Sequence, residues 1–173
     1  MRRVLLDTNI YGLIVEKREE EEFKELLNKA RATVYGCQAI RKELRDTPRN
    51  KRLLTNTGIR NLRIGLLGLY DTITKEHEVI ADGKTQALTQ KYLKRFCELT
   101  GQTAIDHLKI DFLLVACATL NNLDLIISDD HKTLMSSAAS KAYNFVNGLE
   151  GLKLPTMLTY EDTKVFLKRL SPL

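Results

Sequence analysis

Four acidic sites in this chain have the residue types and the positions that a divalent metal site requires. These sites are Asp7, Glu43, Asp111 and the adjacent pair Asp129 and Asp130. Two of them follow short apolar runs, at residues 4–6 and 125–127, and such runs are typical of strands in a buried parallel sheet. Because ligands bind at the carboxyl ends of the strands in an open α/β sheet, we expect these acids to meet there.

Carboxylates that meet at one place repel one another unless a cation lies between them. Hard divalent ions such as Mg²⁺ and Mn²⁺ prefer oxygen ligands and keep several bound waters. We therefore expect Asp7, Glu43, Asp111 and Asp130 to lie close enough to share one metal, or a pair of metals about 4 Å apart.

Each acid also has an ordinary structural interpretation when it is considered alone. Asp7 would cap the helix that follows it, and Glu43 would lie on an exposed helix face. Asp111 would pair with a nearby cation, and the acidic pair after residue 128 would serve in a turn and a cap. The joint occurrence of all four sites is what favours the metal interpretation.

Composition sets the broad class of the protein. The 173 residues are enough for one domain with a sizeable core, and the hydrophobic content of 43% is that of an ordinary globular protein. The formal net charge is +5, a mild basicity that permits a nucleic-acid partner without requiring one. The three cysteines have no zinc-type spacing, and no apolar run approaches the length of a membrane span. We expect a cytoplasmic protein with no membrane association.

The pattern of apolar residues predicts alternating strands and helices. Strands are expected at residues 3–6, 33–36, 124–128 and 157–159, and helices at about 8–15, 62–79, 84–100, 103–121, 133–147 and 160–170, with further helices after residues 22 and 37. This alternation predicts a three-layer α/β/α sandwich with a mostly parallel central sheet. We expect a single domain over 1–173 with a helical middle segment at about 49–100, whose first part, 49–63, is polar and basic.

The ordered motifs resemble those of the PIN-domain ribonucleases, a family that includes the toxins of many toxin–antitoxin pairs. In chain order they are Asp7-Thr8-Asn9 after a hydrophobic strand, Glu43-Leu44 in a helix, Asp111 at the start of a helix of small residues, and Ser128-Asp129-Asp130 after a strand. Each motif is short and unspecific by itself, but their order and the intervening elements agree over nearly the whole chain.

The resemblance implies metal-dependent hydrolysis of RNA phosphodiester bonds, with Mg²⁺ or Mn²⁺ as cofactor. Its catalytic and metal-binding residues would be Asp7, Glu43, Asp111 and Asp130, with Asp129 as a substitute metal ligand and Thr8, Asn9 and Ser128 as supporting polar groups. It also implies a homodimer and an antitoxin protein as partners. The chemistry requires no nucleophilic serine or cysteine, and the sequence has no G-x-S-x-G motif.

Basic residues cluster on both sides of Glu43 in the sequence, over residues 41–63. The cluster includes Arg41, Lys42, Arg45, Arg49, Lys51 and Arg52. Either these residues bind the RNA backbone or they form a solvated helix face. Only 6% of residues are aromatic and tryptophan is absent, so recognition of bases by stacking is not indicated.

Two other functions compete with a ribonuclease. The first is a non-catalytic RNA-binding or scaffolding protein of the same fold, which the presence of every acid position disfavours. The second is a phosphotransfer protein. A dehalogenase-like phosphatase has Asp-x-Asp after its first strand, where this chain has Asp7-Thr8-Asn9. A receiver domain has paired acids in the same place, whereas the pair here comes at Asp129 and Asp130.

Overall fold

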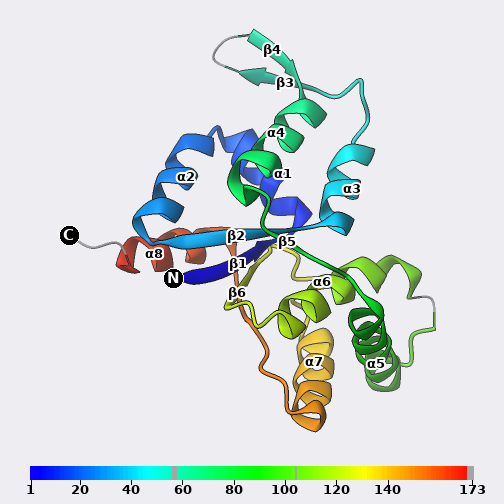
Figure 1. The fold of residues 1–173 in the computed structure, drawn as a ribbon. Helices are drawn as coiled ribbons and strands as arrows, with labels where there is room; N and C mark the ends of the chain where they lie inside the picture. The colour runs from blue at the N-terminus through cyan, green and yellow to red at the C-terminus, as the bar shows by residue number, and fades with distance from the viewer. Residues whose placement is uncertain (56–57, 104, 171–173) are drawn as a thin grey trace.

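A five-stranded parallel sheet is the centre of the fold (Figure 1). The computed structural model describes residues 1–55, 58–103 and 105–170, with the backbone alone for residues 53–55. The strands are β1 (Arg2–Leu6), β2 (Ala32–Cys37), β5 (Glu78–Val79), β6 (Leu125–Ile127) and β7 (Thr156–Leu158). They lie in the order β5-β2-β1-β6-β7, and each neighbouring pair is parallel. The apolar runs that predicted the first strand and the strand after residue 124 form the middle of this sheet.

Helices cover both faces of the sheet (Figure 1). On one face lie α1 (Thr8–Lys17), α2 (Glu20–Lys29), α3 (Gln38–Asp46) and α4 (Leu62–Thr74), and on the other lie α5 (Gly83–Thr100), α6 (Lys109–Leu120) and α7 (Ser137–Glu150). The last helix, α8 (Tyr160–Leu170), packs beside α2, where the rings of Tyr160 and Phe23 have centroids 5.6 Å apart. This arrangement confirms the predicted three-layer α/β/α fold.

The middle of the chain differs from the sequence prediction at two places. An antiparallel hairpin of β3 (Arg52–Thr55) and β4 (Gly58–Asn61) occupies the start of the segment that we expected to be helical. Helix α4 ends at Thr74 because Lys75 and Glu76 both adopt left-handed backbone angles, with φ of 46° and 70°. The chain then forms the two-residue edge strand β5, which the pattern of apolar residues did not indicate.

The start of α6 also differs from the prediction. A 3₁₀ turn at Asp106–Leu108 precedes it, so the α-helix begins at Lys109, later than expected. The interior of α6 is buried nearly all round, as its apolar sequence predicted. The three cysteines are free thiols, two of them in the core. Among the described residues, no helix combines the length and the apolar character that crossing a membrane would need.

The close approach of α4 to β2 depends on a glycine. An added Cβ at Gly36 would lie 2.2 Å from the Tyr70 hydroxyl oxygen and 2.7 Å from its Cζ. The buried Tyr70 hydroxyl lies 3.3 Å from the carbonyl oxygen of Cys37, to which it donates, and 3.2 Å from Glu78 Oε1. A side chain at position 36 would therefore push a buried ring away from the strand that precedes α3.

Replacing Gly36 by alanine should lower the free energy of unfolding by about 1–3 kcal/mol, because the added methyl group overpacks the contact with Tyr70. Chemical denaturation measures this change. The control is Gly12→Ala in α1, where an added Cβ meets no atom within 4 Å and should raise stability by up to about 1 kcal/mol. Equal stability of the two variants would contradict the close approach of α4 and β2.

Candidate active site

The ends of the two middle strands bring Asp7 and Ser128 together. Strands β1 and β6 pair in parallel with Leu6 opposite Ile127, so the next residue of each strand lies at the same edge of the sheet. The backbone amide of Asp7 donates to the carbonyl oxygen of Ile127 at 2.9 Å. The register of the sheet therefore fixes the relative position of these two polar residues, which are 121 residues apart in sequence.

Three donors hold the Asp7 carboxylate in one orientation. Its Oδ1 accepts from the backbone amide of Thr8 at 2.6 Å, and its Oδ2 accepts from Ser128 Oγ at 2.7 Å and from Asn9 Nδ2 at 2.8 Å. The side chain is only 6% exposed. Asp7 also stands at the N-cap of α1. Both sequence interpretations of this residue, the cap and the acidic centre, therefore describe its position.

The acids expected from the sequence line one open hollow of about 660 Å³. Its lining residues are Asp7, Thr8, Asn9, Glu43, Asp46, Thr47, Ile110, Asp111 and Asp130. They come from the start of α1, from α3 and the residue after it, from the start of α6, and from the loop after β6. Acids that are far apart in the sequence thus face a common space at the carboxyl edge of the sheet.

Threonine hydroxyls contact the carboxylates in this hollow. Thr8 Oγ1 donates to Glu43 Oε2 at 2.5 Å. Thr133 Oγ1 lies 2.6 Å from Asp111 Oδ2 and also contacts Asp130 Oδ2. A hydroxyl carries one proton, so two full hydrogen bonds at Thr133 require a second proton on one of the two carboxyl groups. Such bridges reduce the repulsion between the acids without any cation.

The pKa values of Asp111 and Asp130 are shifted in opposite directions from the ordinary value of an aspartate. Burial raises the pKa of Asp111, and the charges of Asp130 and Glu43 raise it further, against the lowering effect of the Thr133 hydrogen bond. Burial also raises the pKa of Asp130, but hydrogen bonds from Thr133 and from the amide of Lys132 outweigh burial and hold this pKa below its usual value. The two carboxyl groups that contact the Thr133 hydroxyl thus have pKa values that shift in opposite directions.

Asp7 is the most deeply buried acid of the hollow. Its burial, together with the charges of Asp111 and Glu43, raises the pKa of Asp7 to about 6, although hydrogen bonds from Ser128 and Thr8 favour the charged form. The ionised carboxylate is thus costly in the folded protein. A cation in the hollow would lower that cost.

The oxygen-only donor set fits a hard divalent ion, but the side-chain positions do not form a closed metal site. Among the described residues, no three Asp, Glu, His or Cys side chains come together to hold one ion. The prediction that the carboxylates lie close enough to share a metal is therefore not met by this arrangement. The hydroxyls of Thr8 and Thr133 contact carboxylate oxygens of Glu43 and Asp111.

Asp129 faces away from the hollow. Its Oδ1 accepts from the backbone amide of Tyr160 at 2.9 Å, which satisfies a free amide at the start of α8. It is absent from the lining of the hollow, whereas the neighbouring Asp130 is present. The choice of Asp130 over Asp129 as the fourth acid agrees with this geometry, and the proposed substitute role of Asp129 has no support in it.

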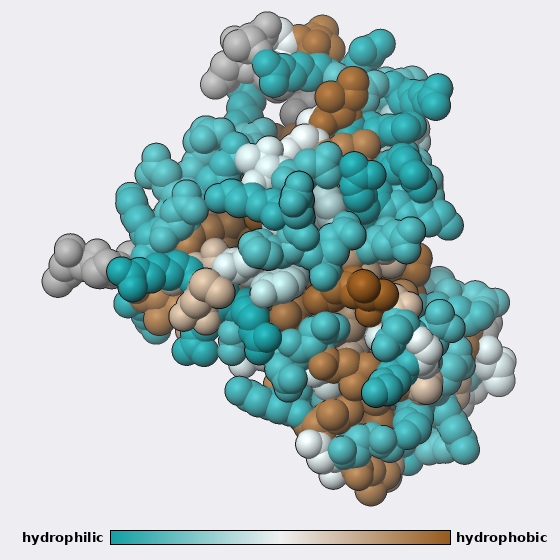
Figure 2. Space-filling model, in the orientation of Figure 1, coloured by the Kyte–Doolittle hydropathy of each residue, from teal (hydrophilic) through white to brown (hydrophobic). Residues whose placement is uncertain are grey.

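The basic residues predicted to bind RNA lie beside the acidic hollow and outside it. Arg41 pairs with Asp71 at 3.2 Å. Together with Lys42 and Arg45 it lines a separate hollow between α3 and β5. The exposed residues Arg49 and Lys51 lie between α3 and the hairpin, and the exposed Arg52 is the first residue of the hairpin. Figure 2 shows a mainly hydrophilic surface over α3, with apolar side chains exposed both near the hairpin at the top and in the lower half of the molecule.

The sequence did not identify several residues that line the hollow or contact its acids. Thr133 follows Asp130 by three residues, a spacing at which an acid often accepts hydrogen bonds from the next turn of chain. Asp46 follows Glu43 by three residues, which places both on the same side of α3. These spacings were available as signals. Thr47 and Ile110 had no comparable signal, because neither forms a motif with the acids.

No protein-family model matches the sequence, and no curated protein matches it. The fold does have a solved counterpart in a Rickettsia felis structure described as VapBC2 bound to a DNA fragment from their promoter. One chain of that structure superimposes with a TM-score of 0.57 at 12% sequence identity, and the match covers 91% of this chain and 98% of that chain. At this identity the similarity shows a shared fold, which supports the PIN-like architecture expected from the motifs.

The raised pKa of Asp7 predicts how stability depends on pH in chelator. Because the pKa of about 6 in the folded protein exceeds the ordinary value of 3.8 for an aspartate, the folded state binds the proton more tightly. The stabilisation is complete below pH 3.8 and is lost as the pH rises through 6, a change of roughly 3 kcal/mol for this residue. Asp7→Asn should remove this part of the pH dependence, as measured by denaturation between pH 4 and pH 7.5.

The control for this measurement is Glu25→Gln, which removes an exposed carboxylate of α2. We expect the control to follow the wild-type stability curve across the whole range. If Asp7→Asn also follows that curve, the ionised Asp7 is not costly in the folded protein and the electrostatic description of the hollow is wrong.

Proposed function

We propose that this protein is a metal-dependent endoribonuclease that hydrolyses phosphodiester bonds of RNA at the acidic hollow. One observation carries the proposal. Acids from four separate places in the sequence line a single open hollow at the carboxyl edge of a parallel sheet. This edge is where ligands bind in folds of this type. The PIN-like fold and the ordered motifs support the same conclusion.

Asp7, Glu43, Asp111 and Asp130 are the residues that would hold Mg²⁺ or Mn²⁺. The ion supplies a water of lowered pKa and positive charge for the anion that forms during hydrolysis. Asp129 is left out of the proposed ligand set because its carboxylate accepts from the amide of Tyr160. Thr8 and Thr133, whose hydroxyls contact Glu43 and Asp111, would orient these two carboxylates beside the ion.

The other polar residues of the hollow have orienting roles in this proposal. Ser128 and Asn9 hold Asp7 through its Oδ2, and Asn9 Oδ1 also accepts from the amide of Asp129 at 3.4 Å. This network connects the ends of β1 and β6 and keeps Asp7 facing the hollow. The hollow is open to solvent, so an extended strand of RNA has access to the carboxylates.

The partners proposed here come from the resemblance and from the printed description of the structural counterpart. That structure is a VapBC2 complex, which supports the proposal that this chain is a toxin with an antitoxin protein as partner. The homodimer remains a prediction from the resemblance. A small neighbouring gene that encodes a DNA-binding fold would favour the toxin role over a role in RNA processing.

A non-catalytic RNA-binding protein of the same fold is the alternative. The observation that favours it is the separation of the carboxylates, since no three of the described acidic side chains meet around one point. Under this alternative the hydroxyl-bridged arrangement is permanent, and divalent ions neither bind in the hollow nor support cleavage. A test of metal dependence therefore separates the two functions.

Cleavage of a single-stranded RNA panel should require Mg²⁺ or Mn²⁺ and stop in chelator. Asp7→Asn and Asp130→Asn should each lower the rate roughly a hundredfold or more, because each removes a proposed metal ligand at nearly constant volume. Gel-based cleavage assays measure the rates, and circular dichroism verifies the fold of each variant.

The matched control is Asp129→Ala, which removes the neighbouring carboxylate. It should keep the wild-type cleavage rate and lose about 1 kcal/mol of stability, because the amide of Tyr160 loses its acceptor. Cleavage that persists undiminished in chelator, or in folded Asp130→Asn, would refute the proposed metal centre.

The exposed cations next to the hairpin should add sequence-independent affinity for RNA. In an Asp7→Asn background, replacing Arg49, Lys51 and Arg52 by alanine should weaken binding and reduce the slope of log affinity against log salt. The reduction should reach roughly 2 units if all three residues contact phosphates of a single strand, because each contact releases counterions. Fluorescence anisotropy over a range of salt concentrations measures the slope.

A control with equal loss of charge tests whether position matters. Lys94, Lys141 and Lys153 are exposed residues of the α5 and α7 region on the other side of the molecule. Their triple alanine variant should keep the wild-type slope to within about 0.5 unit, since those residues contact no phosphate in this account. Equal slopes in both triple variants would show that the run after Glu43 is only a solvated surface.

A further inference from the structure

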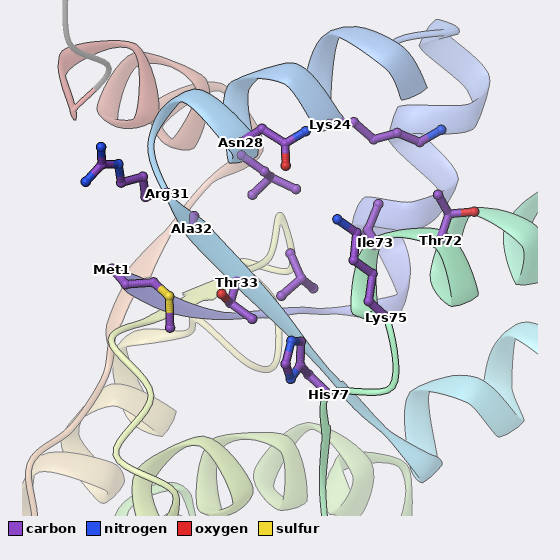
Figure 3. A pocket seen from close by; sticks show the side chains of 12 residues that line it. Met1, Lys24, Asn28, Arg31, Ala32, Thr33, Thr72, Ile73, Lys75 and His77 are labelled. Carbon is purple, nitrogen blue, oxygen red and sulfur yellow. The ribbon is translucent and has the colours of Figure 1, made fainter.

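The outer edge of β5 is an open edge of the central sheet. Among the described residues no strand pairs with it, because β5 ends the strand order β5-β2-β1-β6-β7. The inner edge of β5 is paired with β2, where Gly36 lies opposite Glu78 and the backbone amide of Gly36 donates to the carbonyl oxygen of His77 at 2.7 Å. Figure 3 shows His77, the residue before β5, beside β2.

The backbone groups of Glu78 and Ile80 point toward the open side of this edge. Consecutive residues of a strand turn their N–H and C=O groups in opposite directions, and those of His77 and Val79 face β2. Glu78 is exposed, and Ile80 is 78% exposed although its side chain is large and apolar. Unpaired backbone groups at an exposed sheet edge are a template for a further strand.

A basic face of α3 borders the open edge, and the chain from β5 to α5 runs below this helix (Figure 1). Gln38, Arg41, Lys42 and Arg45 follow one another at helical spacing, so they lie on one side of α3. A hollow of about 500 Å³ separates them from β5, and its lining residues are Gln38, Arg41, Lys42, Arg45, Glu78, Val79, Ile80 and Ala81. This lining has three cations and one acid.

Lys42 and Arg45 are the cations that a partner would meet. Both are exposed, and within the described parts of the chain neither forms an ion pair. Arg41 pairs with Asp71 at 3.2 Å. The Glu78 carboxylate accepts from the Tyr70 hydroxyl, with 3.2 Å between the oxygens. The hollow beside α3 therefore has a net positive charge that favours carboxylates.

A second hollow lies on the other side of the same edge. Its volume is about 400 Å³, and its lining residues are Glu78, Ile80, Asp82, Lys84, Thr85, Leu120 and Asn121. Glu78 and Ile80 line both hollows, so the edge runs between them. Successive side chains of a strand point to opposite faces, so a strand added here would place alternate side chains in the two hollows. The second hollow has two acids and one cation and does not favour carboxylates.

We propose that the outer edge of β5 binds an extended segment of another protein as an added strand with acidic side chains at alternate positions. Backbone hydrogen bonds to Glu78 and Ile80 would hold the segment, and its carboxylates would face Lys42 and Arg45. Because β5 has only two residues, the backbone bonds are few and charge complementarity supplies the preference among partners. None of the residues that line the acidic hollow takes part, so this surface is separate from the proposed ribonuclease site.

Fluorescence anisotropy with a labelled peptide, Ser-Glu-Val-Glu-Val-Glu-Ser, tests the proposal. We expect saturable binding at least about tenfold tighter than that of the same peptide with Lys in place of Glu, because the hollow beside α3 is basic. A peptide with Pro in place of Val keeps the carboxylates but cannot pair as a strand, and it should also bind at least about tenfold more weakly. Absence of saturable binding by the acidic peptide, or equal binding of all three peptides, would overturn the proposal.

Two variants locate the binding surface. Ile80→Pro removes an amide that faces the added strand and leaves the pairing with β2 intact, since that amide points away from β2. Lys42→Gln with Arg45→Gln removes the two cations. Each variant should weaken binding of the acidic peptide by at least about tenfold. The controls are Ile80→Val, which keeps the amide, and Lys94→Gln with Lys153→Gln, which removes the same charge elsewhere, and both should bind as the wild type does.

Hydrogen exchange of single amides reports the added strand directly. In the wild-type protein the acidic peptide should slow the exchange of the Glu78 and Ile80 amides by at least about tenfold, and it should change that of Val79, which faces β2, much less. Unchanged exchange at both Glu78 and Ile80 in the peptide complex would overturn the proposal.

RNA is the competing occupant of the basic hollow. A single-stranded oligouridylate would overturn the proposal if it bound more tightly than the acidic peptide and lost affinity in the Lys42 and Arg45 double variant but not in Ile80→Pro. The cations alone would then define the surface. Thermal unfolding verifies that each variant is folded. These measurements are made in chelator and involve no RNA cleavage, so their outcome is independent of the proposed ribonuclease activity.

Discussion

The burial of one carboxylate at the end of the middle strand is the constraint on which the site depends. The strand order β5-β2-β1-β6-β7 puts β1 at the centre, so the residue after it cannot reach bulk water easily. Asp7 occupies that position and is 6% exposed. A buried charge needs partners or a neighbouring cation, and the protein provides three hydrogen-bond donors from the start of α1 and the end of β6.

These hydrogen bonds do not fully compensate the free-energy cost of burying the ionised Asp7 carboxylate. Their combined effect leaves the pKa of Asp7 at about 6, since burial and the neighbouring acids Asp111 and Glu43 outweigh them. The arrangement is costly for a purely structural role, in which an apolar residue would serve better. Natural proteins tolerate such local costs chiefly at functional sites. Hydrogen bonds from the hydroxyls of Thr8 and Thr133 reduce the repulsion between the neighbouring acids of the hollow.

Much of the fold follows from the sequence because its signals are local. The runs at residues 4–6 and 125–127 are apolar and end in polar residues, and they form the middle strands. Which of Asp129 and Asp130 faces the hollow was harder to predict, because the two residues are adjacent and their side chains point in different directions. Only Asp130 lines the hollow, and Asp129 accepts from the amide of Tyr160. The sequence did not predict the hairpin, because each of its strands has only four residues. It did not predict β5 either, because two residues are too few to show an alternation of apolar and polar side chains. The bridge through Thr133 depends on tertiary packing of α6 against the loop after β6, which no local pattern encodes.

The central claim is that the acidic hollow holds a divalent ion. The most direct measurement is a crystal structure of the protein grown with Mn²⁺, with the metal located by its anomalous scattering. We expect a peak in the hollow, bound by carboxylate oxygens from among Asp7, Glu43, Asp111 and Asp130, with Thr133 no longer bridging Asp111 and Asp130. A structure from such crystals with no peak in the hollow, and with the Thr133 bridge intact, would contradict the claim.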